Sequence, residues 1–231
     1  MDFKTAVILT PDMQTNKLAG EISAEIMEKY EPQLLKAITQ REYSFAPQTD
    51  RVKIYNIALE NSKPDGGQIM NAIHYNRRKA IIEECAEKYL KENSVFILDG
   101  FINFRLDEYK KELRGIVYSA GEEYAAMKEY EEFLDMLRFF VSVQSPKEDT
   151  VHIINRNGKI CVLNKRKKDI TDIYVNEFSE TEENLTNEDA VLSALISIAP
   201  LHIIIHDEFE NDQIYKTIKE IFPHVTFENS Q

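Results

Sequence analysis

Hydrophobic and polar positions repeat with two different periods along this chain, and each change of period marks a change of predicted element. Residues 3–9 have the apolar content of a strand, and residues 16–30 carry apolar side chains at helical spacing. Residues 51–60 alternate as a strand does. Pro, Asp and two Gly over 61–67 then give the clearest boundary signal in the chain. The pattern therefore predicts a small α/β unit over residues 1–62, whose role the sequence does not indicate.

The middle of the chain has a long helical pattern. A helix is predicted over 68–92, and a heptad-like apolar repeat then extends from Ile102 to Val141. One helix of that span would be about 60 Å long, so we expect a break between Gly121 and Glu129. The expected result is an antiparallel pair, 102–120 and 129–143. Its facing stripes would bury four side chains, Leu113, Ile116, Phe133 and Leu137.

The last third of the chain predicts a hairpin and a βαβ unit. Asn157-Gly158 separates two β-branched runs, 150–155 and 159–163, as in a two-residue turn with positive φ. A helix capped by Thr186 or Asn187 follows an ambiguous segment. A strand, a helix and a strand end the chain, and two strands joined in this way should be parallel. Their predicted bounds are 201–206, 211–222 and 224–228.

The predicted fold class is therefore mixed α/β (α+β). It comprises the small N-terminal α/β unit, the central antiparallel helix pair, the β-hairpin and the C-terminal βαβ unit. We expect two domains, residues 1–62 and residues 63–231.

Two histidines four residues apart, His202 and His206, raise the question of a metal site. Pro200 and the β-branched run between the histidines predict a strand, not a helix. Four strand rises separate the two imidazoles by roughly 13 Å, whereas zinc–nitrogen bonds are about 2 Å. We therefore expect that they share no metal ion. A ligand or catalytic site using His206, Asp207 and Glu208 stays open, because open α/β sheets bind ligands at strand C-termini.

Composition narrows the function classes. The 231 residues carry a net charge of −12, which disfavours general binding to nucleic acid or to anionic lipid. No apolar run reaches the ~18 residues of a membrane span, and the N-terminus lacks the pattern of a signal peptide. The two cysteines, Cys85 and Cys161, fall at core-type positions. We expect a cytoplasmic protein with reduced thiols.

Two cationic features are candidates for ligand or partner contacts. Arg105 lies among apolar residues near a predicted helix start, where a cation is unfavourable unless it is paired. Asp99, Glu108 or Glu131 could pair with it, and an anion contact is the alternative. A basic edge accompanies the hairpin, with Arg156 and Lys159 beside the loop residues Lys165, Arg166, Lys167 and Lys168. It is either a solvated edge that prevents strand aggregation or a contact for an acidic partner.

Catalytic motifs are missing from the sequence. It has no GxxxxGK[ST] loop, no GxGxxG, no GxSxG and no HExxH. The acidic run 181–189 lacks the alternating ligands of a calcium loop. We predict no cofactor, no bound metal and no catalytic residue.

Three segments resemble a known family. They are "DGFINFRLDEYKKEL" at 99–113, "EYEEFLDMLRFFVSVQSPKEDTVHI" at 129–153 and "NEDAVLSALISIAPLHIIIH" at 187–206. Together they are similar to the YtxC family of sporulation proteins from endospore-forming bacteria, over roughly residues 85–228. The resemblance implies a bacterial cytoplasmic protein associated with spore formation, and it implies no reaction or cofactor.

The resulting hypothesis is a non-catalytic interaction or regulatory protein with protein partners, and homo-oligomerisation stays open. The alternative is an enzyme or small-ligand binder with its site at the C-terminal βαβ end. A deep pocket with converging polar groups would favour the alternative, whereas a broad apolar or charged patch would favour an interaction protein.

Overall fold

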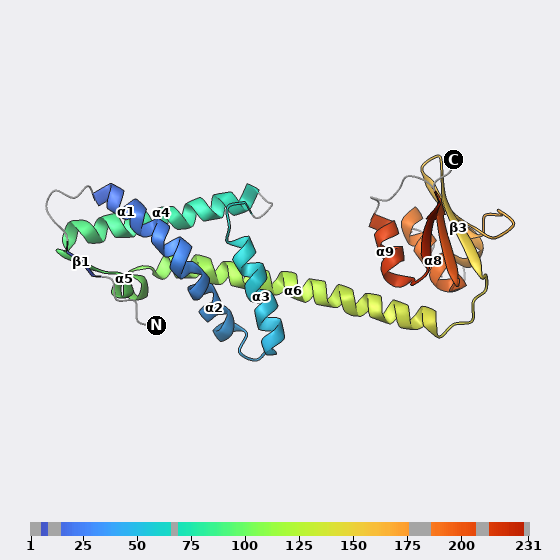
Figure 1. The fold of residues 1–231 in the computed structure, drawn as a ribbon, viewed down its shortest axis with the longest axis horizontal. Coiled ribbons are helices and arrows are strands. Elements are labelled where there is room, and N and C mark those ends of the chain that lie inside the picture. The colour runs from blue at the N-terminus through green and yellow to red at the C-terminus, as the bar shows by residue number, and fades with distance from the viewer. Residues whose placement is uncertain (1–5, 9–14, 66–68, 176–185, 207–212, 229–231) are drawn as a thin grey trace. The chain divides into compact units, whose positions relative to one another are not determined.

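A computed structural model describes residues 6–8, 15–65, 69–175, 186–206 and 213–228. It divides into two compact units, Met1–Met127 and Lys128–Gln231. The fold is mixed α/β, as predicted, with long helices and a four-stranded mixed sheet (Figure 1).

The first unit is mostly helical. Its chain runs through α1 (Thr15–Glu25), a π-helical turn η1 (Ile26–Tyr30), α2 (Glu31–Glu42), α3 (Gln48–Asn61), α4 (Ile69–Glu92), α5 (Leu98–Arg105) and the start of α6 (Asp107–Ser142). Two short strands, β1 (Ala6–Ile8) and β2 (Val95–Ile97), pair antiparallel. The predicted N-terminal strand is thus confirmed over residues 6–8, and its partner lies far along the chain.

The predicted strand over 51–60 is wrong, because these residues form most of α3. Their alternating apolar residues suggested a strand, but only Ile54 and Ala58 are fully buried, four residues apart on one face of the helix. Pro47 precedes the helix, where its fixed φ suits a helix start. Packing of this face against the core therefore favours a helix over a strand for these residues.

The predicted break in the central helix is also wrong, because α6 continues through residues 121–129 to Ser142. The actual interruption lies earlier, at Leu106, between α5 and α6. Gly121, taken as a sign of a break, lies inside the helix. A Cβ atom there would stand 1.7 Å from the hydroxyl of Tyr43, so the glycine makes room for the tyrosine ring.

The burial expected of the helix pair holds fully for Leu113, whereas Ile116 and Leu137 are half-buried and pack against the cores of the first and second unit, respectively. Leu113, Val117 and Ala120 are fully buried in the core of the first unit. Phe133, expected in the seam between two helices, is 49% exposed. The predicted seam does not form, because residues 129–143 continue along α6 to Ser142 and do not fold back along residues 102–120.

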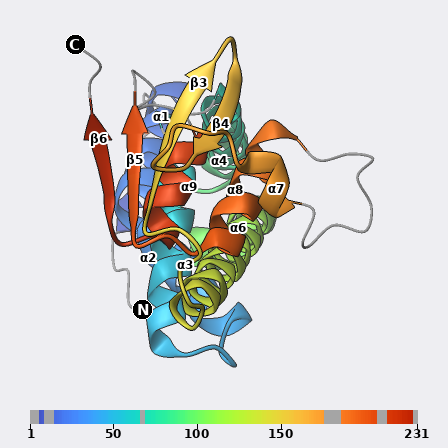
Figure 2. The same cartoon turned by 90° about the vertical axis from the view of Figure 1, so that its right-hand side faces the viewer.

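The second unit is built on a four-stranded sheet with the order β4-β3-β5-β6 (Figure 2). Strands β3 (Thr150–Arg156) and β4 (Lys159–Leu163) pair antiparallel, as the predicted hairpin requires. Asn157 and Gly158 have φ of 56° and 84°, which confirms the positive-φ turn. Strands β5 (His202–His206) and β6 (Val225–Glu228) are parallel to each other, and β5 is parallel to β3.

Helices cover one face of this sheet. They are α8 (Asn187–Ile198), α9 (Gln213–Ile221) and the short α7 (Thr171–Val175), which settles the described part of the ambiguous segment as helical. Thr186 caps α8 in a capping box with Asp189. The helices pack on alternate strand residues, among them Val151, Ile153, Ile203 and Ile205.

Residue 62 does not separate the compact units. Helix α1 packs along α4, and β1 pairs with β2, so the first 62 residues share a core with residues 69–127. A domain boundary near residue 62 stays a prediction, and these contacts argue against independent folding of the N-terminal segment.

Candidate functional site

The sheet face opposite the helices carries most of the chain's histidines. The five histidines of the sequence include His74 in the first unit, and the other four lie on this part of the second unit. Alternation along β5 places His202 and His206 on the same side of the sheet, away from the buried Ile203 and Ile205. These two imidazoles do not contact each other. Each lies beside an imidazole from another segment of the chain.

His152 of β3 and His206 of β5 form a hydrogen-bonded pair. Their Nδ1 and Nε2 atoms are 2.8 Å apart, and the rings are nearly parallel. Burial, followed by the neighbouring imidazole of His206, lowers the pKa of His152, so its neutral form is favoured at pH 7. The other ring nitrogen of His206 lies 3.8 Å from a carboxylate oxygen of Glu228 on β6. His202 and His224 form a looser pair, with ring centroids 5.6 Å apart.

This arrangement can share or pass a proton between two imidazoles. The pair supplies two imidazole nitrogens as possible metal ligands. Across the described ranges, no group of three His, Cys, Asp or Glu side chains is placed so that it could hold a metal ion. Of the strand-end residues predicted as a candidate site, His206 belongs to the pair. Asp207 and Glu208 lie outside the described residues.

Two cavities lie in the described part of the first unit. One of about 220 Å³ lies between α2 and α3. Another of about 690 Å³ is bordered by α3, α4 and α6, and it mixes cations such as Lys111 with carboxylates such as Glu60 and Glu123.

The basic edge of the hairpin is an ordered turn. Asn164 organises it by accepting hydrogen bonds from the backbone N–H groups of Arg166 and Lys168 on its side-chain oxygen. Lys165, Arg166, Lys167 and Lys168 are all exposed, and Lys165 pairs with Asp149 at 3.2 Å. Because β4 is an edge strand, this turn fits the predicted role of a charged sheet edge.

Arg105 is the last residue of α5, not a residue near a helix start. A cation suits the C-terminal end of a helix, so its position needs no countercharge. The side chain is exposed, and its guanidinium lies 5.8 Å from the ring centroid of Tyr89. Within the described ranges it makes no ion pair with Asp99, Glu108 or Glu131, so the expected carboxylate contact is replaced by a cation–π contact.

Both cysteines pack as predicted. Cys85 lies against the core of the first unit, and Cys161 is buried beside Asp169 in the second. Burial raises the pKa of both thiols, which favours the unreactive protonated form.

Sequence reasoning missed the most buried charges of the first unit. Arg78 of α4 is fully buried and forms a two-point ion pair with Glu31, with nitrogen–oxygen distances of 3.1 and 3.2 Å. The Tyr109 hydroxyl donates to the same carboxylate at 2.7 Å, and burial raises the pKa of this tyrosine. Arg78 also donates to the carbonyl of Ser62. This network ties α2, α4 and α6 together.

A signal for this network exists in the sequence. Arg78 falls in phase with the buried positions Ile82, Ala86 and Leu90, at intervals of four residues. Ile73 and Arg77, one residue out of phase with this stripe, are both exposed, Ile73 to 54%. A charged residue in register with a buried stripe indicates a paired charge in the core.

The second half of α6 carries an exposed apolar face. Leu134 is buried, and Leu137 and Val141 pack on the core of the second unit. Other large side chains follow at intervals of three and four residues on a different side of the helix, and they are between 49% and 68% exposed. We call Phe133, Met136, Phe139 and Val143 the apolar face of α6.

Acidic residues border this face. Glu129, Glu131 and Glu132 precede it, and within the described residues they have no ion-pair partner. Asp135 is paired with Arg138 at 2.6 Å. The face is thus apolar along its length and negative at its N-terminal end.

Comparison with known proteins gives one consistent result. The profile of the YtxC-like family matches residues 16–224. The uncharacterized protein YtxC of Bacillus subtilis (strain 168) is 24% identical over 201 residues, covering 85% of this chain and 70% of that protein. No solved structure matches. In the described parts of the chain, no helix combines the length and apolar character needed to cross a membrane.

Proposed function

Because the chain belongs to the YtxC-like family, we propose that it is a cytoplasmic, non-catalytic interaction or regulatory protein that acts in spore formation. It binds another protein through the apolar face of α6. The association with spore formation rests on the resemblance to this family, and the mode of binding rests on the exposed side chains of the helix.

The observation that carries the proposal is the exposure of four large apolar side chains along one helix. Single exposed apolar residues are ordinary on protein surfaces. A contiguous row at helical spacing is typical of a binding surface. Phe139 is 68% exposed and Val143 63% exposed, although α6 buries Leu134 in the core of the second unit. One side of α6 therefore packs on the core of the second unit, and the apolar face on its other side remains accessible to a partner.

The chemistry of the face indicates the kind of partner. Side chains repeating every three or four residues match the apolar stripe of another amphipathic helix. The glutamates at 129, 131 and 132 favour basic residues at the matching end of that stripe, and they disfavour a partner with like charges. We therefore expect the partner to present an amphipathic helix flanked by Lys or Arg.

The test is a double substitution, Met136→Glu with Phe139→Glu, in a sporulating strain that lacks its own copy of the gene. Both side chains are exposed, so stability should change by no more than about 0.5 kcal/mol per substitution. Two charges on the apolar face should abolish partner binding, and the count of heat-resistant spores should fall to that of the deletion strain.

The matched control is Leu201→Glu, which charges a 50% exposed apolar residue elsewhere in the second unit. This variant should form spores normally. Normal sporulation by the double variant, at normal protein abundance, would refute the proposal. A loss in both variants would show that any added charge in this unit is harmful and would also refute it.

A further inference from the structure

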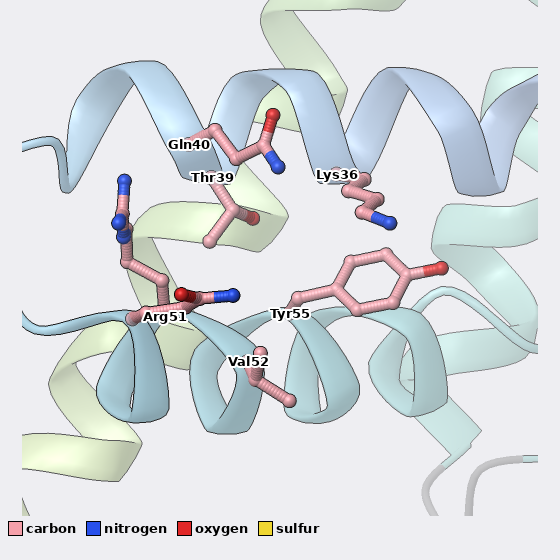
Figure 3. A pocket seen from close by; sticks show the side chains of 7 residues that line it. Lys36, Thr39, Gln40, Arg51, Val52 and Tyr55 are labelled. Carbon is pink, nitrogen blue, oxygen red and sulfur yellow. The ribbon is translucent and has the colours of Figure 1, made fainter.

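A cavity of about 220 Å³ opens between α2 and α3 (Figure 3). Polar and apolar atoms both contribute to its walls, with the larger share apolar, and seven residues line it. From α2 they are Lys36, Thr39 and Gln40, and from α3 they are Gln48, Arg51, Val52 and Tyr55.

The charges on this lining have one sign. Lys36 and Arg51 contribute two cations, and no Asp or Glu lines the cavity, although the chain has 40 acidic and 28 basic residues. Neither cation forms an ion pair with a described residue. Arg41, on the same helix as Lys36, does find a carboxylate, that of Glu42 at 2.7 Å. The cavity therefore concentrates unneutralised positive charge on an acidic protein.

Arg51 is held in place at a cost to the fold. Its Nε is buried and has no hydrogen-bond partner, and an unsatisfied buried donor is destabilising, more so when it is charged. In Figure 3 the guanidinium extends from α3 toward α2, on the side of Thr39 and Gln40. A bound acceptor would have to reach the terminal Nη groups of the guanidinium, because the Nε itself is buried.

We propose that this cavity binds a small anion of the phosphate class. The planar guanidinium of Arg51 presents paired donors that match two oxygens of such an ion. The Lys36 ammonium adds a second charge, and the side-chain amides of Gln40 and Gln48 add neutral donors. Tyr55 and Val52 form the apolar part of the wall.

The volume limits the ligand. Sites for drug-sized ligands occupy roughly 300–1,000 Å³, and this cavity is smaller. It suits inorganic phosphate or a small phosphorylated compound, and it is too small for a dinucleotide.

The experiment is thermal unfolding of the whole protein with and without millimolar inorganic phosphate, against sodium chloride at equal ionic strength. Phosphate should raise the Tm because a ligand that binds only the folded state stabilises it. Arg51→Met should remove this rise. The same substitution should leave the Tm without phosphate unchanged or higher, because it removes the unsatisfied Nε.

Arg41→Met is the matched control, since it removes a cation from the same hairpin but outside the cavity. It should keep the phosphate response. No phosphate response in the parent protein would overturn the proposal, and so would a full response in Arg51→Met. Equal losses in Arg51→Met and Arg41→Met would point to general charge screening and would also overturn it. Isothermal titration with phosphate checks each result independently of stability.

Discussion

Replacing Arg78 by methionine is expected to destabilise the first unit by about 3–5 kcal/mol, the usual cost of removing one partner of a buried ion pair. The substitution would leave the Glu31 carboxylate, itself 3% exposed, without its countercharge. Among the described side chains that bond to this carboxylate, the hydroxyl of Tyr109 alone would still donate to it. The free energy of unfolding from urea titration, followed by far-UV circular dichroism, measures this loss.

The neighbouring arginine supplies the control. Arg77 pairs with Glu112 at 3.1 Å, but its side chain is 59% exposed. Arg77→Met should therefore cost less than about 1 kcal/mol. Adding Glu31→Gln to Arg78→Met should recover part of the loss, because it removes the stranded charge and keeps an acceptor for Tyr109. If Arg78→Met and Arg77→Met were equally stable, the network would not hold the three helices together.

Replacing Ala126 by proline should open the middle of α6. Ala126 is exposed, so the substitution acts on the backbone and not on packing. Proline removes one helical hydrogen bond and clashes with the preceding turn, at a cost of about 3 kcal/mol. That energy corresponds to roughly a hundredfold faster hydrogen exchange of nearby amides, measurable over residues 121–131 by mass spectrometry.

Ala126→Ser is the control for this experiment, since serine fits a helix with a small loss of propensity. Its exchange should stay close to that of the parent. If proline left the exchange of residues 121–131 unchanged, this segment would not be helical. The break expected from the sequence would then be correct, and the continuous α6 would be wrong.

Local chemistry was enough to predict much of the second unit. Asn157-Gly158 specifies its turn, Thr186 caps its helix, and the isoleucines of 203–205 specify a strand. Each of these signals acts within a few residues. For this reason the hairpin, α8 and the parallel pair β5 and β6 were predictable without knowledge of the fold.

The errors arose where distant residues decide the structure. Residues 51–60 alternate like a strand, but none of the described strands lies beside them, and burial of Ile54 and Ala58 selects a helix. Gly121 resembles a helix break until Tyr43, 78 positions earlier in the sequence, is seen to occupy the space beside it. The pairing of Arg78 with Glu31 spans 47 residues. Periodicity carries no information about such partners.

In the candidate sites, too, single residues were recognisable from the sequence, whereas their partners from distant segments were not. His206 could be singled out from the sequence, but its partner is His152 on another strand, not its neighbour His202. Of the apolar face of α6, only Phe133 was singled out from the sequence, and it was predicted to lie in a buried seam. These side chains are exposed because α6 contacts the core of the second unit through a different side, that of Leu134, Leu137 and Val141.

Site-specific crosslinking tests the central claim most directly. A photoreactive amino acid is placed at position 136, on the apolar face of α6, or at position 201 as the control, and sporulating cells are irradiated. Position 136 should yield a crosslink that position 201 does not, and the crosslinked peptide should belong to an amphipathic segment flanked by Lys or Arg. Equal crosslinks at both positions, or a crosslink at 136 only to a second copy of this chain, would contradict the proposal that this face binds a partner protein.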